Sequence, residues 1–283
     1  ITTMRTDPGG KGINVSKVID KLGGKSIAIG ILGGDTGRSI QTALKRMGLE
    51  TDFCFVEGET RTNMKVIDPV NHTNTDINEP GVTVSKEILD ALLDDLLEKI
   101  SEGDIVVISG SMPKGSPEDT YYVWTKACRE KGAKVILDAD GALFATGVKA
   151  SPYLVKPNNH ELSRFAGRKL ETVEELEAEA KKLMQDYGIK KVVVSMGGDG
   201  ALYVTEEKTI YAEGLKVPVG STVGAGDSVV AALAFAEENG NSLEDTVRLS
   251  TATGGANVMC SGTQAAEYEV IESLMPKVVF RTL

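Results

Sequence analysis

A single carboxylate, Asp227, lies where a glycine-rich loop meets an apolar helix in GSTVGAGDSVVAALAFA, residues 220–236. The first N–H groups of a helix have no acceptor inside the helix and carry a partial positive charge. Gly224, Ala225 and Gly226 are small enough for their N–H groups to face one anion, which suits a phosphate group. Asp227 is then placed to accept a proton from an attacking hydroxyl, and the helix start is expected to keep it ionised. The alternative is an aspartate-capped helix after an ordinary loop.

A second group of polar residues occurs in KPNNHELSRF, residues 156–165. Asn158 and Glu161 are three residues apart, so they share a face if a helix begins there. Their oxygens are hard ligands that suit Mg²⁺, directly or through water. The alternative is a capping arrangement at the start of the helix.

A third group is PGGKGINVSKVIDKLGG, residues 8–24. Gly9 and Gly10 allow a ligand to approach the backbone, and Lys11 offers a positive charge. Asn14 lies at the start of an amphipathic helix. The alternative is a capped helix with a surface lysine.

Other glycine-containing motifs are incomplete. GGDTGRS (33–39) is one residue too short for a Walker A loop and has Arg in place of Lys, so it is interpreted as a strand-to-helix turn. No G-x-G-x-x-G follows a predicted strand, and GSMPKG (110–115) is not a nucleophile elbow. A Rossmann dinucleotide site and an α/β-hydrolase are therefore disfavoured.

Short aliphatic runs alternate with amphipathic segments along most of the chain. The runs predict strands buried on both faces, at residues 25–32, 104–110, 133–140, 152–158 and 190–198. The amphipathic segments predict helices at residues 85–100, 119–132 and 172–188, the last with a Thr172/Glu175 capping box and a Gly188 stop. The expected fold is α/β, with helices on both faces of a mostly parallel sheet and ligands at the carboxyl ends of the strands.

Residues 51–81 interrupt this alternation with three β-like runs and no helix. We expect a small β-sheet lid inserted into one α/β domain spanning 1–283, joined by the segment 1–7. Such a small sheet is marginal alone in water, which favours a homodimer through paired lids.

Composition excludes several classes of protein. The 283-residue chain has a net charge of −10, which disfavours nucleic-acid and anionic-membrane partners. No apolar run is long enough for a membrane span. Three widely spaced cysteines and two histidines disfavour a structural zinc site and fit a reduced cytoplasm.

Five segments occur in an order that is far more specific than any one of them: GGKGINVS, KPNNHEL, VVSMGGDGAL, TVGAGDSVVAA and GGANVMCSGT. In this order they resemble the ribokinase-like PfkB carbohydrate kinases, and nearly the whole chain takes part. The resemblance implies a three-layer α/β/α fold with a β-lid and transfer of phosphate from ATP with Mg²⁺.

The resemblance also implies roles for individual residues. Asp227 would be the general base, the amides of Gly224, Ala225 and Gly226 the anion hole, and Asn158 with Glu161 the Mg²⁺ site. Contacts to ATP would come from Lys156, Asn158, Ser195, Gly197, Gly200 and Asn257. Contacts to the sugar substrate would come from Gly9, Gly10, Lys11, Asn14 and, for its phosphate, Arg61.

Within the family, GGKGIN, ETRTNMKV, TDINEPG and KPNNHEL look like the branch that phosphorylates ketohexose monophosphates. The expected acceptor is fructose 1-phosphate, giving fructose 1,6-bisphosphate, and the alternative acceptor is tagatose 6-phosphate. A further alternative is a regulator that binds nucleotide or sugar without chemistry.

Two departures from the family pattern are visible. Family members begin with a strand carrying Asn-Pro-x-x-Asp, whose aspartate binds sugar hydroxyls, and the sequence here starts downstream of it. Ser221 replaces an aspartate common before the Thr-x-Gly-Ala-Gly-Asp motif. That position is not the expected base, so the predicted chemistry is unaffected.

Overall fold

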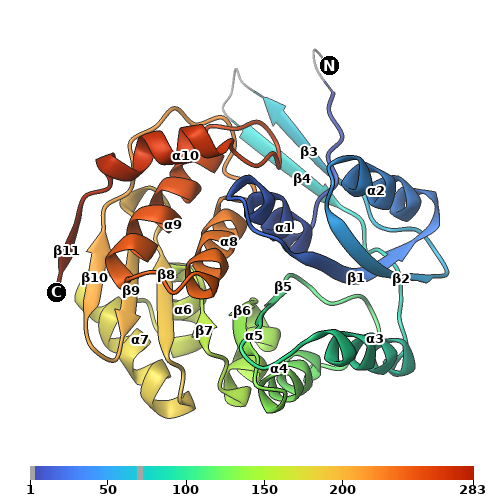
Figure 1. Cartoon of the computed structure of the whole chain (residues 1–283), viewed down its shortest axis with the longest axis horizontal. Coiled ribbons are helices and arrows are strands. Elements are labelled where there is room, and N and C mark those ends of the chain that lie inside the picture. Colours follow the sequence, from blue (N-terminus) through green and yellow to red (C-terminus); the bar gives the residue numbers. More distant parts are fainter. Residues whose placement is uncertain (1–3, 69–72) are drawn as a thin grey trace. The chain divides into compact units, whose positions relative to one another are not determined.

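The computed structural model describes residues 4–68 and 73–283, and its chain forms two compact units (Figure 1). The larger unit contains the residues up to 26 together with 97–111 and 118–283, and the smaller unit contains 27–96 and 112–117. The sequence predicts one α/β domain with an inserted lid, and the smaller unit contains the segment assigned to that lid, residues 51–81.

A seven-stranded sheet forms the centre of the larger unit. Its strands, in sheet order, are β11 (Phe280–Thr282), β10 (Thr209–Ala212), β9 (Ala201–Thr205), β8 (Lys191–Ser195), β7 (Leu154–Val155), β6 (Lys134–Asp138) and β5 (Ile105–Ser109). Strands β5 to β8 pair in parallel, whereas β9, β10 and β11 each pair antiparallel to their neighbours. Strands β5 to β8 and β10 therefore run in one direction, so the sheet is mostly parallel as expected, and β5 to β8 are four of the five predicted aliphatic runs.

Helices cover both faces of this sheet (Figure 1). One face carries α1 (Lys11–Lys21), α8 (Ala225–Glu238), α9 (Leu243–Val258) and α10 (Tyr268–Leu274). The other carries α4 (Thr120–Glu130), α5 (Gly141–Gly147), α6 (Asn159–Ala166) and α7 (Val173–Tyr187). The expected α/β/α layers are confirmed. The core is aliphatic and includes Val230 and Leu233 of α8 and Ile136 of β6.

The predicted helix signals act as expected in α7. Thr172 and Glu175 form a capping box, in which each side chain accepts a hydrogen bond from the other residue's N–H. Gly188 ends the helix in the left-handed conformation. Neighbouring residues thus supply the signals at both ends of the helix. The predicted bounds, 172–188, therefore agree with α7 to within a residue at each end.

The smaller unit holds β1 (Ile27–Gly33), α2 (Gly34–Arg46), β2 (Glu50–Val56), β3 (Asn63–Asp68), β4 (Thr73–Asn78) and the first part of α3 (Lys86–Lys99). The three β-like runs predicted in 51–81 are β2, β3 and β4. Strands β3 and β4 form an antiparallel hairpin, but β2 pairs in parallel with β1 in a separate two-stranded sheet.

Two expectations about strands are therefore corrected. The run at 25–32 does not join the seven-stranded sheet. It forms β1, which pairs instead with β2, a strand of the segment assigned to the insert. Residues 4–7 form no strand, and residues 1–3 lie outside the described part of the chain. Aliphatic composition identifies a buried strand but not its partner, which is why the sheet assignment failed.

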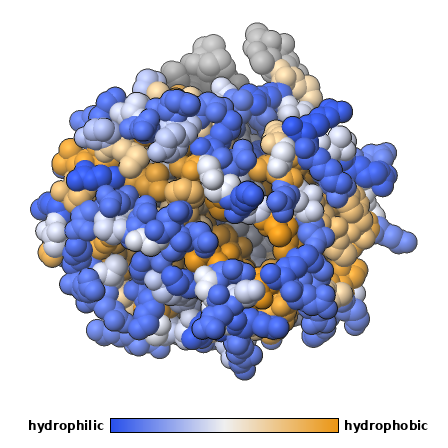
Figure 2. Space-filling view, viewed as in Figure 1, coloured by the Kyte–Doolittle hydropathy of each residue, from blue (hydrophilic) through white to orange (hydrophobic). Residues whose placement is uncertain are grey.

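Hydrophilic side chains cover most of the face shown in Figure 2. Among the described residues, no helix combines the length and apolar character needed to cross a membrane. Cys54, Cys128 and Cys260 are all free thiols.

The turn between β8 and β9 generates a stability prediction. Gly200 has φ +109°, and a Cβ there would lie 2.0 Å from the carbonyl oxygen of Ala212. Gly200→Ala should therefore lower the free energy of unfolding by more than about 2 kcal/mol, measured by urea denaturation. Gly198 in the same turn has open space at its Cβ position. Equal losses for Gly200→Ala and Gly198→Ala would contradict the close contact.

Candidate active site

The loop before α8 leaves several main-chain N–H groups free. Gly224 is the N-cap, with φ 80° in the left-handed region that favours glycine. Within the described ranges, the N–H groups of Gly224, Gly226 and Asp227 donate no hydrogen bond, while that of Ala225 makes a long one to the Thr222 carbonyl (3.4 Å). Of the three amides predicted to form an anion hole, those of Gly224 and Gly226 are thus free and that of Ala225 is partly occupied, while the Asp227 amide is a further free N–H group. Free N–H groups at a helix start suit a phosphate oxygen.

Asp227 is buried at this helix start, with 7% of its surface exposed. Its Oδ2 accepts a hydrogen bond from Asn14 Nδ2 of α1 at 2.7 Å. Burial raises the pKa of Asp227, and the Asp138 carboxylate adds to the rise, while the Asn14 hydrogen bond and the nearby lysines oppose it. Desolvation thus outweighs the stabilising contacts, and the direction of this shift leaves the expectation of an ionised Asp227 as a prediction. A carboxylate with a raised pKa is a stronger base.

Asp138, at the end of β6, is the site residue that the sequence analysis missed. It is 2% exposed, and its two oxygens contact two ammonium groups, Lys11 Nζ at 2.9 Å and Lys156 Nζ at 3.2 Å. Burial alone would raise the pKa of Asp138, but Lys156 and Lys11 hold it below its usual range. Burial also opposes the charge on Lys11, yet Asp138 keeps the pKa of Lys11 above its usual range. A signal was present, since Asp138 ends a buried parallel strand, where ligands gather.

Lys156 connects this charge cluster with the start of α8. It follows β7 and is 4% exposed. A Cβ at Gly226 would lie 3.6 Å from Lys156 Nζ, so the ammonium group faces the N-terminus of α8. Lys11 and Lys156 act on both the Asp138 and the Asp227 carboxylates, and Lys156 brings a positive charge close to the free N–H groups. This arrangement can stabilise an anion that gains charge during a reaction.

Asn158 and Glu161 form a capping box at the start of α6, as the alternative interpretation of this motif predicts. Asn158 Oδ1 accepts from the Glu161 N–H, and Glu161 Oε2 accepts from the Asn158 N–H, both at 2.8 Å. In the described part of the chain, Glu161 Oε1 makes no hydrogen bond, and no group of three or more His, Cys, Asp or Glu side chains could hold a metal. One carboxylate oxygen therefore remains for a cation that takes its other ligands elsewhere.

The predicted nucleotide residues fall in two places. Ser195 ends β8, and its N–H donates to the Pro157 carbonyl (3.0 Å), so this strand end lies beside the capping box. Gly197 and Gly200 form the tight turn that follows. Asn257 of α9 is buried, and a Cβ at Gly224 would lie 3.5 Å from its Nδ2. Asn257 therefore borders the free N–H groups of the α8 loop directly, whereas Gly200 also has a packing reason, because a Cβ there would clash with the Ala212 carbonyl.

The predicted sugar segment leads into α1. Gly10 is the N-cap with φ 123°, and Lys11 is the first helical residue. A Cβ at Gly224 would lie 3.7 Å from Asn14 Nδ2, so Asn14 contacts both the loop and Asp227. The structure thus brings Lys11 and Asn14 to the Asp227 site, with Gly9 and Gly10 just before them. Arg61 belongs to the smaller unit, where its side chain packs beside Gly81.

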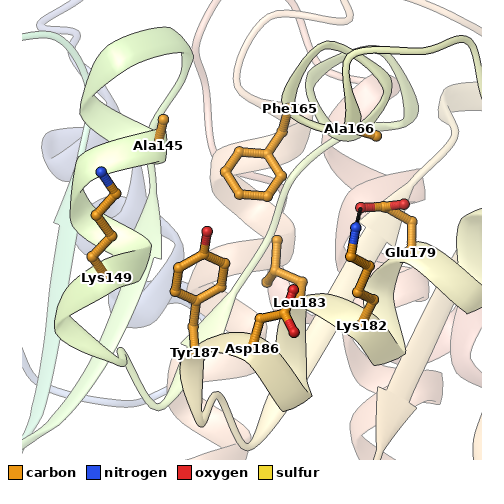
Figure 3. A pocket seen from close by; sticks show the side chains of 9 residues that line it. All are labelled: Ala145, Lys149, Phe165, Ala166, Glu179, Lys182, Leu183, Asp186 and Tyr187. Carbon is orange, nitrogen blue, oxygen red and sulfur yellow. Dashed lines mark ion pairs between the residues drawn. The ribbon is translucent and has the colours of Figure 1, made fainter.

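A separate hollow of about 320 Å³ lies among α5, α6 and α7 (Figure 3). Phe165 and Tyr187 project into it, 6.1 Å apart between ring centroids, and Glu179 pairs with Lys182 (4.0 Å) at its edge. None of the predicted site residues lines this hollow. The chemistry-bearing groups of the larger unit gather instead at the carboxyl ends of β6 and β7 and at the starts of α1, α6 and α8.

Comparisons with known proteins agree with this geometry. A family model described as "pfkB family carbohydrate kinase" matches residues 1–269. The chain is 39% identical to a 1-phosphofructokinase of Bacillus subtilis, covering 96% of this chain and 87% of that protein. It is 35% identical to a 1-phosphofructokinase of Haemophilus influenzae, covering 98% and 88%. Escherichia coli phosphofructokinase-2, solved in complex with potassium, superimposes with a TM-score of 0.92 at 31% identity, over 98% of this chain and 89% of that one.

The buried charge cluster generates a second prediction. Asp138→Asn leaves two ammonium groups, one of them fully buried, without their carboxylate. Loss of one partner of a buried ion pair typically costs about 3–5 kcal/mol of stability, which urea denaturation measures. The control is Asp140→Asn, because Asp140 pairs with Arg164 at 2.6 Å on the surface and the asparagine can still cap α5. That exposed pair is worth about 0–1 kcal/mol. Equal losses of stability for Asp138→Asn and Asp140→Asn would show that the Asp138 ion pairs contribute no more than an exposed pair.

Proposed function

The chain belongs to the pfkB family of carbohydrate kinases, and we propose that it transfers the γ-phosphoryl group of ATP to fructose 1-phosphate. The acceptor is the free primary hydroxyl of the ketohexose monophosphate, and the product is fructose 1,6-bisphosphate. Support for this acceptor comes from the relatives named 1-phosphofructokinase at 39% and 35% identity. The observation that carries the proposal is the buried Asp227 carboxylate beside free helix N–H groups and the Lys156 ammonium.

Asp227 accepts the proton of the attacking hydroxyl in this proposal. A primary hydroxyl is a weak nucleophile until its proton is taken up as the bond to phosphorus forms. The raised pKa of Asp227 makes proton transfer more favourable, and the Asn14 hydrogen bond orients the carboxylate. The free N–H groups and Lys156 hold the charge that develops on the transferred phosphoryl group. Catalysis is then positioning plus charge stabilisation.

Mg²⁺ fits the donor set at α6 only with ligands supplied by the nucleotide. Mg²⁺ is commonly held by one or two carboxylates together with substrate phosphates and water. Glu161 offers one carboxylate oxygen, while the amide oxygen of Asn158 is already used in the capping box. We therefore assign Glu161 to the cation or its water, and Asn158 to holding Glu161 in place. When bound, the ion neutralises phosphate charge.

The remaining contacts divide between the two substrates. Nucleotide contacts are assigned to Lys156 and to the segments carrying Ser195, Gly197, Gly200 and Asn257. Sugar contacts are assigned to Gly9, Gly10, Lys11 and Asn14. Arg61, in the smaller unit, is assigned to the phosphate already on the sugar, because a guanidinium matches the geometry of a phosphate group.

A steady-state assay of ADP release tests the proposal with fructose 1-phosphate, fructose 6-phosphate and tagatose 6-phosphate. Fructose 1-phosphate should give the highest kcat/KM. Tagatose 6-phosphate is the alternative within the family, and Escherichia coli phosphofructokinase-2 has been solved with fructose 6-phosphate. A preference for either would replace the proposed acceptor. No ADP release with any of them would favour a regulator that binds without chemistry.

The β3–β4 hairpin supports a homodimer. Met64 and Ile77 lie directly opposite each other, Val66 shares their face, and these side chains are 52%, 54% and 49% exposed. A two-stranded sheet with an open apolar face gains stability when a second copy covers it. Escherichia coli phosphofructokinase-2 has a tetrameric inhibited form, so assembly occurs among similar proteins. We propose that two copies of this chain pair through their hairpins.

Asp227→Asn should lower kcat by about 10²–10⁴-fold, because the asparagine keeps the shape and loses the base. The wild-type kcat should fall toward acid pH with a midpoint above the ordinary aspartate value, since the pKa of Asp227 is raised and its basic form is needed. Binding of an ATP analogue, measured by calorimetry, should survive the substitution. Near wild-type kcat would remove Asp227 from the mechanism, and joint loss of binding and folding would support the helix-cap interpretation.

Arg61→Ala should raise KM for the sugar phosphate by about ten-fold or more, because a charge-assisted hydrogen bond contributes roughly 1.5–3 kcal/mol. KM for ATP should barely change. The matched control is Arg38→Ala, because Arg38 is exposed in the same unit and pairs with Asp35 at 2.6 Å. Equal effects on both KM values would overturn the assignment of Arg61.

Ile77→Asp should convert the dimer into a monomer, because it places a charge in the apolar face that the second copy covers. Light scattering at micromolar concentration measures the mass, which should be twice that of one chain for the wild type. Asp76→Asn changes the opposite face, where Asp76 pairs with Lys65 at 3.2 Å, and should leave the dimer intact. A monomeric wild type would contradict the proposed assembly.

A further inference from the structure

Lys17 is a buried cation with no role in the chemistry proposed above. It lies on α1 and is 8% exposed. Its Nζ donates hydrogen bonds to the main-chain oxygens of Pro8 and Thr263, the latter at 3.2 Å. Burial lowers the pKa of Lys17 and Arg5 adds to the effect, while Asp7 and Asp227 oppose it. The two acceptors of this ammonium group are thus neutral main-chain carbonyls and not carboxylates.

The two carbonyls belong to segments that are far apart in sequence. Pro8 immediately precedes Gly9 and Gly10, which lead into the sugar side of the site. Thr263 belongs to the loop 259–265 that follows α9, close to Asn257 at the border of the anion hole. In the part of the chain that the structure describes, no hydrogen bond joins residues 4–10 directly to residues 259–265. Lys17 supplies the hydrogen bonds that connect them.

A second contact places the same segments against each other. Gly262 has φ +61°, and a Cβ there would lie 2.6 Å from Asp7 Oδ2. Asp7 in turn accepts a hydrogen bond from Arg5 at 2.8 Å. Residues 4–10 form no helix or strand, so side chains rather than a main-chain ladder hold this segment. The position of the sugar segment thus depends on the loop after α9.

We propose that Lys17 is a positioning residue that couples sugar-phosphate binding to nucleotide binding. The inference rests on the proposed function, which assigns Gly9, Gly10 and Lys11 to the sugar and Asn257, just before the loop 259–265, to the nucleotide. A sugar phosphate that orders residues 8–11 also orders the loop after α9 through Lys17. The nucleotide then loses less conformational entropy on binding, and by linkage the effect is equal in the other direction.

Binding measurements on Lys17→Met test the coupling. The Kd of fructose 1-phosphate is measured with and without a non-hydrolysable ATP analogue, and the Kd of the analogue with and without the sugar phosphate. Wild-type protein should show mutual tightening within the usual range of about 5–150-fold. Lys17→Met should reduce both factors to below about two-fold. Lys17→Arg should retain them, because the guanidinium also donates to two carbonyls.

Lys21→Met is the matched control. Lys21 lies one turn further along α1 and pairs with Glu267 at 2.7 Å on the surface, so its loss should leave the coupling unchanged. Gly262→Ala is a second variant for the case in which Lys17→Met does not fold. It pushes Asp7 away while Lys17 remains, and it should also weaken the coupling. Wild-type coupling in the folded Lys17→Met, or in Gly262→Ala if Lys17→Met is unfolded, would overturn the proposal.

A wild-type protein without coupling would overturn it as well. ADP release by the wild type is measured separately. Turnover of a ketohexose phosphate with unchanged coupling in the variants would contradict only the role of Lys17. No turnover would contradict the proposed function itself.

Discussion

The buried ion pairs of Asp138 constrain the rest of the larger unit's site. Asp138 is almost inaccessible to water, so its charge requires partners, and it finds them in Lys11 from α1 and Lys156 after β7. This requirement holds two separate chain segments against the end of β6. Lys11 and Lys156 also act on the Asp227 carboxylate, so the two cations are shared by two carboxylates. The Lys156 ammonium group also faces the start of α8, so the same contacts would serve the proposed phosphate binding as well as folding.

The same cluster tunes Asp227 through opposing effects. Burial and the Asp138 carboxylate raise the pKa of Asp227, while Asn14, Lys11 and Lys156 oppose the rise. The net result is a buried carboxylate of increased basicity that is still hydrogen-bonded in one orientation. A raised pKa makes this carboxylate a stronger base than an exposed aspartate, which is what the proposed role of general base requires. The contacts that pack this site are therefore also the ones on which the proposed proton transfer depends.

Most of the charged and polar side chains of the candidate site lie at the starts of helices. Lys11 begins α1, the Asn158/Glu161 capping box begins α6, and Asp227 lies in the first turn of α8. Each start has N–H groups that need acceptors, and each is placed near the carboxyl end of a parallel strand by the alternation of strands and helices. The capping box is both a helix signal and a way to hold Glu161 in one rotamer. Structural and functional interpretations of that motif are thus compatible.

The sequence by itself determined the helices with local signals and the segments carrying the chemistry. The capping box at Thr172, the stop at Gly188 and the glycine loop before Asp227 depend on neighbouring residues, so periodicity and caps were enough to find them. The tertiary structure alone decided three features, because each depends on contacts distant in sequence. These are the pairing of β1 with β2, the meeting of Lys11 and Lys156 at Asp138, and the raised pKa of Asp227. Burial of a charge is a property of the packed chain, and no local pattern reports it.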